Sequence, residues 1–308
     1  MSLRLLEPGL QTLVVDFGRP ATRSLGVPLG GAADRWSLTL GNALVGNPPD
    51  AAALEVCLAG PTLQAGCDVG CVVFGAPFEV LRGDERLPAG WTFTLRRGEV
   101  LRIAGTPVGA RAYLCVRGGL REPVALGSRS AFAPVRRGQE LACEPSEIAG
   151  RAIDLESDDF GNDPVTLRAL PGPQADWFDP PAFFGPQFMV TPASNRMGLR
   201  LRGQSLTRKP GELVSEPVGP GAVQVVNDGQ CIVLGVDGQT IGGYPKVAHV
   251  IAADLDRLGQ LRPGQDVRFE VVNVEEAEAV YRERAAKLRE WGIRLELDLP
   301  LAAMRAPA

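Results

Sequence analysis

Residues 221–235, GAVQVVNDGQCIVLG, repeat the pattern of residues 61–75, PTLQAGCDVGCVVFG, and this pair of segments decides the expected fold. The offset is constant at 160 residues (231 − 71), and Gln, Asp, Cys, Val and Gly recur in register. Each segment carries a short apolar, β-branched run that ends at glycine, which is typical of β-strands joined by tight turns. We interpret the chain as two copies of one β-rich unit.

Two further segment pairs support this duplication. Residues 34–40 (DRWSLTL) resemble residues 195–201 (NRMGLRL), and residues 98–103 (GEVLRI) resemble residues 264–269 (GQDVRF). All three pairs follow the same order along the chain. Two like units pack with a seam between them, and such seams are preferred places for ligand clefts. We therefore expect the functional site near that seam.

Size, charge and hydropathy exclude several classes of protein. The chain has 308 residues, of which 45% are hydrophobic and 22% charged, as in an ordinary globular protein of one large or two ordinary domains. A net charge of −4 argues against a nucleic-acid partner, which requires a basic surface. No stretch reaches the roughly 18 uncharged apolar residues that cross a bilayer, and residues 1–8 do not form a secretory signal. We expect a cytoplasmic protein with no membrane partner.

Cysteine and histidine limit the chemistry further. The six cysteines mostly have apolar neighbours, as expected of small core residues in a reducing compartment. Cys67 and Cys71 lack a second pair or a nearby histidine, so we expect no metal site. The single histidine, His249, lies in an apolar run, and neither a Gly-x-Ser-x-Gly elbow nor a P-loop motif occurs. A Ser-His-Asp triad and P-loop nucleotide binding are therefore not expected.

Strand patterns dominate the chain. The clearest are residues 12–15, 71–74, 91–95, 112–116, 222–226, 231–234 and 267–272. With 37 Gly and 26 Pro, turns are frequent, and we predict a β-dominated fold, either a sandwich or a barrel, with few short helices and two lobes related by duplication. Residues 1–155 form the expected first lobe and residues 156–308 the second. An acidic linker is predicted at 154–164.

Two helices are expected. Residues 37–44 form a short one, and residues 275–291 a longer C-terminal helix with one buried stripe. The stripe residues are Ala277, Tyr281, Ala285 and Leu288. Beyond this helix, residues 293–299 alternate apolar and polar side chains, which suits a last strand or an arm laid on a partner.

Polar residues gather around glycine turns in the second half of the chain. The pair Gly242-Gly243 lets the backbone approach a ligand closely, and Pro245 fixes the turn that projects Lys246. Lys246 and Arg196 can neutralise a carboxylate, a phosphate or a developing oxyanion. We predict catalytic roles for Arg196, Asp228, Tyr244 and Lys246. We predict substrate contacts for Gly30, Gly31, Asp34, Asn42, Asn195, Glu216, Gln239, Thr240, Gly242 and Gly243.

Several of these residues have structural alternatives. Asp228 and Glu216 suit acid–base chemistry, but they could equally orient the two cations. Asn227-Asp228-Gly229 is also a strong hairpin-turn sequence. Asp34 would be explained as well by capping the start of a helix.

Longer motifs point to a known family. They are GVPLGGAAD (26–34), NALVGN (42–47), GPQAD (172–176), SNRMG (194–198), SEPV (215–218), DGQ (228–230) and QTIGGYPK (239–246). On these motifs the chain resembles the biotin-dependent carboxyltransferase family from about residue 12 to about residue 275. That family also covers allophanate hydrolase subunit 2 and the C-type subunit of 5-oxoprolinase, and it includes the antagonist of a sporulation-kinase inhibitor.

The resemblance implies a fold, partners and an activity. It implies cyclophilin-like β-barrel lobes and a partner like the B-type subunit of 5-oxoprolinase or like allophanate hydrolase subunit 1, together with an A-type subunit. It implies a complex that opens the cyclic amide 5-oxo-L-proline to L-glutamate, a hydrolase reaction that uses ATP, with this chain inactive alone. ATP would bind to the complex, and a partner subunit is one place for it.

Two alternative functions remain. The first is the carboxyltransferase half of a urea carboxylase or allophanate hydrolase-type system. The chain has no Met-Lys-Met biotin-attachment motif, so biotin would arrive on a separate carrier. The second, from another class, is a regulatory binding protein that antagonises a kinase inhibitor.

Overall fold

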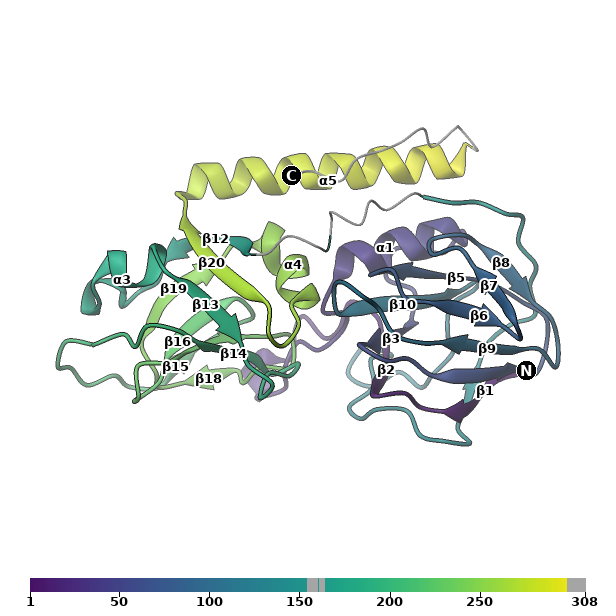
Figure 1. Cartoon of the computed structure of the whole chain (residues 1–308), viewed down its shortest axis with the longest axis horizontal. Helices are drawn as coiled ribbons and strands as arrows, with labels where there is room; N and C mark the ends of the chain where they lie inside the picture. The colour runs from purple at the N-terminus through teal and green to yellow at the C-terminus, as the bar shows by residue number, and fades with distance from the viewer. Residues whose placement is uncertain (154–159, 161–163, 298–308) are drawn as a thin grey trace. The chain divides into compact units, whose positions relative to one another are not determined.

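The computed structural model describes residues 1–153, 160 and 164–297, and the chain divides into two compact units (Figure 1). Unit 1 comprises Met1–Gly18, Asp34–Gly161 and Ala286–Ala308, and unit 2 comprises Arg19–Ala33 and Asn162–Ala285. The units thus differ from the predicted halves at residues 19–33 and from residue 286 onward. The predicted linker at 154–164 lies almost wholly outside the described residues.

Unit 1 is built from antiparallel strands. They are β1 (Ser2–Glu7), β2 (Gln11–Val15), β3 (Ala53–Cys57), β4 (Thr62–Ala65), β5 (Val69–Gly75), β6 (Val80–Arg82), β7 (Glu85–Leu87), β8 (Phe93–Leu95), β9 (Val100–Ile103), β10 (Arg111–Val116) and β11 (Glu140–Ala142). One six-stranded sheet has the order β11-β1-β4-β9-β6-β7, and one five-stranded sheet has the order β2-β3-β10-β5-β8.

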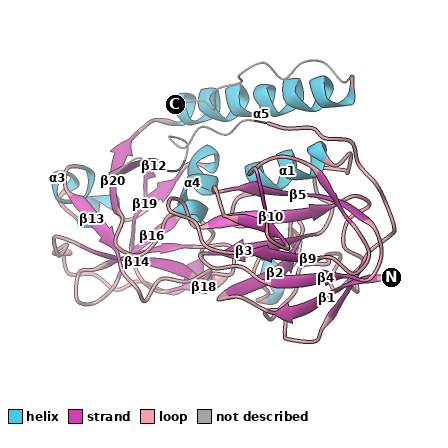
Figure 2. Ribbon diagram, turned by 45° about the vertical axis from the view of Figure 1, so that its right-hand side comes forward, coloured by secondary structure: helices cyan, strands magenta, loops and turns pink. Residues whose placement is uncertain are grey.

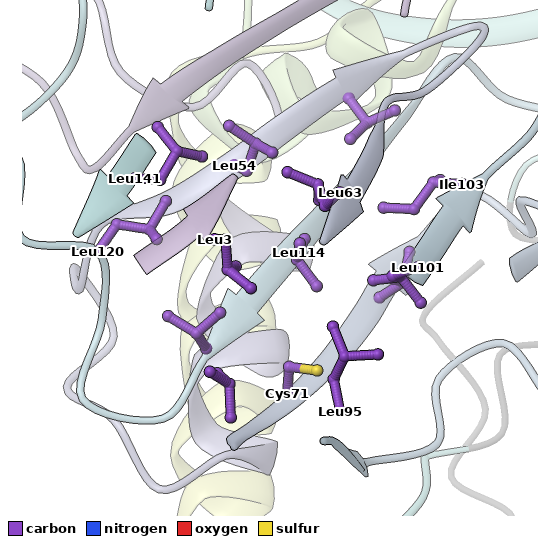
Figure 3. Packing of buried hydrophobic residues seen from close by; sticks show 14 of the residues in the cluster. Leu3, Leu54, Leu63, Cys71, Leu95, Leu101, Ile103, Leu114, Leu120 and Leu141 are labelled. Carbon is purple, nitrogen blue, oxygen red and sulfur yellow. The ribbon is translucent and has the colours of Figure 1, made fainter. Parts of the chain in front are cut away.

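The two sheets of unit 1 enclose one hydrophobic core (Figure 3). Leu3, Leu63 and Leu101 come from the six-stranded sheet, and Leu54 and Leu114 come from the five-stranded sheet. Alternate residues of each strand point to opposite faces, so one face of each sheet supplies this core.

Helix α1 (Arg35–Leu44) covers the other face of the five-stranded sheet, where it contacts β5 and β10 (Figure 1). Asp34 begins the helix, because its Oδ1 accepts from Ser37 N at 2.9 Å and its Oδ2 from Ser37 Oγ at 2.6 Å. A Cβ at Gly41 would lie 2.8 Å from Cys115 Sγ, so only glycine lets the helix approach this closely. The predicted helix at 37–44 is confirmed, with two more residues at its start.

Unit 2 contains a closed barrel of seven strands in the order β12-β19-β16-β17-β14-β13-β20. Its strands are β12 (Val165–Pro171), β13 (Gln187–Val190), β14 (Gly198–Arg202), β16 (Ala222–Val225), β17 (Cys231–Leu234), β19 (Lys246–Val250) and β20 (Asp266–Val271). The pair β12–β20 is parallel and the other pairs are antiparallel. A separate two-stranded sheet pairs β15 (Glu216–Pro217) with β18 (Ile241–Gly242).

Helices are few beside the strands (Figure 2). Besides α1 they are η1 (Arg23–Leu25), η2 (Ala175–Trp177), α3 (Pro180–Phe184), η3 (Ala252–Asp254), α4 (Leu255–Gln260) and α5 (Val274–Glu296). The predicted β-dominated fold is confirmed, and the second lobe is the barrel expected of it. No helix in the described part of the chain has the length and apolarity that crossing a membrane requires.

The sequence repeat is not matched by the same arrangement of strands. Segment 34–40 begins a helix, whereas segment 195–201 leads into β14. Strands β4 and β5 lie in different sheets, while β16 and β17 pair directly. The reason is that a short apolar run does not by itself distinguish a strand from a buried helix segment, and it does not specify which strand lies beside it.

Side chains of strand β16 face both the barrel core and the outside of the barrel wall. Val223 and Val225 belong to the barrel core. Since side chains alternate, Ala222 and Gln224 face the outside of the barrel wall. There Ala222 forms a small buried hydrophobic cluster with Val218, which follows β15, and with Leu234 of β17.

Helix α5 departs from its predicted packing. The expected stripe is only partly buried: Ala277, Ala285 and Leu288 are half-buried and Tyr281 is 57% exposed, while the buried residues of this helix are Trp291 and Leu295. Trp291 packs on Trp36 of α1 with ring centroids 5.6 Å apart. Charged i,i+4 pairs such as Glu278–Arg282 stabilise the exposed turns instead. The strand or arm predicted at 293–299 is wrong for residues 293–296, because α5 continues to Glu296.

Candidate functional site

An ammonium–carboxylate pair forms the centre of the site. Lys246, the first residue of β19, forms an ion pair with Glu216 of β15. The lysine side chain is 7% exposed and the glutamate side chain 36%. Gln174 braces both residues, because its Nε2 donates to Glu216 Oε1 at 3.1 Å and its Oε1 accepts from Lys246 N at 3.0 Å. A buried cation is thus held by a carboxylate that reaches solvent.

The pair keeps Glu216 ionised. The hydrogen bond from the Lys246 ammonium holds the pKa of Glu216 below its ordinary value; desolvation opposes this, and the bond from Gln174 and the charge of Lys246 assist. The carboxylate therefore acts as an acceptor near neutral pH and not as a proton donor.

Glycine at position 172 allows this arrangement. A Cβ there would lie 2.2 Å from the Lys246 carbonyl oxygen, which is far inside contact distance. Gly172 N instead donates to Val247 O at 2.9 Å, and Gln174 N donates to Lys246 O at 3.2 Å. The turn before η2 is therefore laid directly against the start of β19, and it carries Gln174 to the ion pair.

A second glycine, Gly242, lets two carboxamides pack closely against the backbone. Gln224 is the partner of Lys246 in the β16–β19 register. A Cβ on Gly242 would lie 2.5 Å from Gln224 Nε2 and 2.7 Å from Gln239 Nε2, so two carboxamides converge there. Gln239 Nε2 donates weakly to Gln224 Oε1 at 3.4 Å.

Gln224 is the unusual member of this group. It is 2% exposed, and its Nε2 is a buried donor without a hydrogen-bond partner among the described residues. Such a group is uncommon and calls for a physical explanation. An amide donor without a partner, on the residue that pairs with Lys246 in the β16–β19 register, suits the oxygen of a carbonyl or carboxylate group.

The turn that follows β18 frames the same region. Gly242 lies opposite Glu216 in the β15–β18 register. Thr240 is buried, and its carbonyl oxygen accepts from Val218 N at 3.0 Å. Gly243 is exposed, and Tyr244 is 38% exposed. The structure thus brings together Glu216, Gln239, Thr240, Gly242, Gly243, Tyr244 and Lys246 of the predicted residues.

Arg196 lies in a different contact group. Its Nε donates to Asp237 Oδ2 at 2.7 Å, and one Nη donates to Asp237 Oδ1 at 3.1 Å and to Gly31 O at 2.7 Å. Gly30 N donates to Val236 O at 2.9 Å, and Gly30 and Gly31 adopt φ of 64° and 80°, which favour glycine. Arg196 therefore clamps the 19–33 loop to the rest of unit 2, and its guanidinium is engaged by that loop and Asp237.

Asn195 and Asp228 occupy turns at opposite ends of the barrel wall. Asn195 Oδ1 accepts from Met197 N at 2.8 Å before β14, and Asp228 Oδ1 accepts from Gln230 N at 2.9 Å before β17. Since β14 and β17 are antiparallel, these turns are separated by the length of β17, about 10 Å at 3.3 Å per residue. Their described contacts are those of turn residues, and their functional roles stay predictions.

The first-half candidates Asp34 and Asn42 lie in unit 1 and have structural contacts. Asp34 caps α1, and its backbone N donates to Tyr113 Oη at 2.8 Å. Asn42 is fully buried, and its Nδ2 donates to Pro49 O at 3.2 Å and to Ala51 O at 2.8 Å. These contacts hold helix α1 and the loop that follows it.

Three residues of the site were not among the candidates. Gln174, Gln224 and Asp237 each hold or face a predicted residue. Gln224 had a signal, because it is a polar residue inside the otherwise apolar strand Ala222–Val225. The described residues contain no group of three His, Cys, Asp or Glu side chains placed to hold a metal ion.

Comparison with known proteins places this geometry in context. A family model described as carboxyltransferase domain, subdomain A and B, matches residues 25–271. The C-type subunit of 5-oxoprolinase from Haemophilus influenzae is 35% identical over 90% of this chain and 94% of its own length. The protein of the same name from Escherichia coli strain K12 is 36% identical over 89% of this chain and 93% of its own length.

A solved structure is also similar. The crystal structure of the K. lactis urea amidolyase superposes with a TM-score of 0.86 and 26% sequence identity over 94% of this chain. This chain spans 20% of that longer protein.

Proposed function

Because the chain belongs to the carboxyltransferase domain family, subdomains A and B, we propose that it is the C-type subunit of a 5-oxoprolinase, the enzyme that opens 5-oxo-L-proline to L-glutamate. The main support is the similarity, over nearly the full length, to two bacterial proteins that have this subunit name. Urea amidolyase matches only through one part of a much longer chain.

The reaction fits the chemistry of the Lys246 region. Water adds to the ring carbonyl carbon, the ring C–N bond breaks, and the ring nitrogen gains a proton. Negative charge builds on the carbonyl oxygen while the new bond forms. The buried Lys246 ammonium and the Gln224 Nε2 donor are suited to stabilise that charge, because fixed donors in a dry site act more strongly than in water.

Other residues position this pair of donors. Glu216 and Gln174 fix the ammonium, and Gly242 lets the two carboxamides lie against the backbone. Tyr244 is exposed two residues after Gly242 and is our candidate for proton handling or orientation. We place Arg196 in support of the site through its clamp on the 19–33 loop.

The sequence has no P-loop motif for a triphosphate. We propose that ATP binds to a partner subunit of the complex. Biotin has no place in the proposed reaction.

The proposed partners are the A-type and B-type subunits of the same enzyme, with activity only in the assembled complex. The test is an omission experiment that measures glutamate formed from 5-oxoproline and ATP. We expect turnover with all three subunits and none when any one is left out. Turnover of 5-oxoproline that does not depend on this chain contradicts the proposal.

The similarity to urea amidolyase favours one second candidate, carboxyl transfer to urea. It predicts urea-dependent ATP consumption when the chain is supplied with a biotin carboxylase, a biotin carrier and bicarbonate. Tight binding to the B-type partner without turnover of either substrate would instead favour a regulatory role.

A further inference from the structure

A pocket of about 600 Å³ opens on unit 1 and shares no residue with the candidate site. It lies at the strands β1, β4 and β9 of the six-stranded sheet. The residues that define its chemistry are Arg4, Glu7, Thr62, Arg102 and Arg137. A volume of this size is within the range of small-molecule sites.

Two of the arginines share the outer face of the sheet. Arg4 pairs with Gln64 across β1–β4, and Arg102 pairs with Thr62 across β4–β9. Thr62 and Gln64 are two residues apart on β4, so Arg4 and Arg102 point to the same face. From strand spacing and rise, their Cα atoms are about 12 Å apart, and two extended guanidinium groups can converge over such a span.

The third arginine is held over the same face by a turn. Gly138 N donates to Leu5 O at 2.7 Å, and Leu5 N donates to Gln139 O at 2.9 Å. Gly138 has φ of 80°, so this turn suits glycine after Arg137. A β-bulge between Leu5 and Glu7 bends β1 at the same place. Bulges of this kind commonly re-aim side chains beside functional sites.

The charges of the pocket are not neutralised internally. Arg4, Arg102 and Arg137 form no ion pair with any residue in the described ranges 1–153, 160 and 164–297. Glu7 is the single carboxylate of the lining; Glu140, which lies opposite Arg4 in the β1–β11 register, is outside the lining and accepts from Ser2 Oγ. Three guanidinium groups and one carboxylate leave a net charge of +2 in a chain whose net charge is −4.

We propose that this pocket binds a small organic ligand with two anionic groups, either phosphates or carboxylates. Arginine forks match both groups with paired hydrogen bonds, and a dianion balances the net charge of the lining. The Thr62 hydroxyl and the exposed backbone of the turn at Gly138 supply neutral contacts at the same pocket.

The test is calorimetric titration of the purified chain at low ionic strength with three probes: ADP, inorganic pyrophosphate and glutarate. We expect binding of ADP and pyrophosphate if the anionic groups are phosphates, and of glutarate if they are carboxylates. Arg102→Gln and Arg137→Gln are each expected to raise the Kd at least tenfold, and higher salt to weaken binding because these charges are exposed.

Arg97→Gln is the matched control, because Arg97 is an exposed arginine of unit 1 outside the pocket lining. It should change the Kd less than twofold. Circular dichroism checks that all variants are folded, and Arg4→Gln replaces any that is not. The proposal is overturned if none of the three probes binds, or if Arg97→Gln weakens binding as much as Arg102→Gln.

Discussion

Replacing Glu216 by Gln should destabilise the protein more than removing its partner Lys246. Glu216→Gln keeps the shape of the side chain but leaves an ammonium that is 7% exposed without its anion. Lys246→Met leaves a carboxylate that is 36% exposed and can be hydrated, while methionine fills a similar volume. The asymmetry follows from the different burial of the two partners.

The magnitude follows from the same exposures. Breaking a fully buried ion pair by removing one partner costs about 3–5 kcal/mol. Because Glu216 is about a third exposed, solvent screens the pair, and we expect about 2 kcal/mol for Glu216→Gln. Lys246→Met should cost roughly 0.5–1 kcal/mol. At about 2–4 °C per kcal/mol, the midpoint of thermal unfolding falls by roughly 4–8 °C for Glu216→Gln and by roughly 1–4 °C for Lys246→Met.

Thermal unfolding followed by circular dichroism at pH 7.5 measures the difference. The double variant should resemble Lys246→Met, since no charge is then left unpaired in the interior. Glu85→Gln is the control, because its pair with Arg82 is solvent-exposed and should cost less than about 1 kcal/mol. The reasoning is refuted if Lys246→Met lowers the midpoint as much as Glu216→Gln does.

Three further perturbations test neighbouring contacts. Gly172→Ala should cost about 3 kcal/mol or more in unfolding free energy, since its Cβ meets the Lys246 carbonyl oxygen at 2.2 Å; a midpoint within 3 °C of the parent would contradict this. The pKa of Glu216 is lowered in the fold, so its contribution is present above its ordinary value of 4.5 and is lost as the pH falls through the folded pKa. The midpoint difference between parent and Glu216→Gln should therefore shrink over that acid range, and a difference independent of pH argues against the pair. Arg196→Met should cost about 2–4 kcal/mol and speed limited proteolysis within residues 19–33, because the clamp to Gly31 is lost; an unchanged cleavage pattern would speak against it.

Local sequence patterns predicted the features that depend only on neighbouring residues, namely short strands and a helix cap. Short apolar runs became strands such as β5 and β17, and Asp34 capped a helix, because alternation and capping act within a few residues. The motif QTIGGYPK placed Gly242 and Lys246 near Glu216, since one turn connects β18 to β19.

Contacts between distant segments could not be predicted in this way. Gln174 reaches Lys246 from 72 residues away, and only the register of β16 and β19 sets Gln224 beside that lysine. The partner of Arg196, Asp237, is likewise defined by the fold. The exposed face of α5 shows the same limit, because an amphipathic pattern does not say whether a surface is available to cover it.

The most direct test of the central claim is the kcat for 5-oxoproline of a purified complex of the A-type and B-type partners with this chain, compared between parent and Lys246→Met. Removing a donor that stabilises a developing oxyanion lowers kcat by about 100- to 1,000-fold, and we expect a loss in this range with assembly of the complex unchanged. An assembled Lys246→Met complex that retains kcat within threefold of the parent would contradict the account.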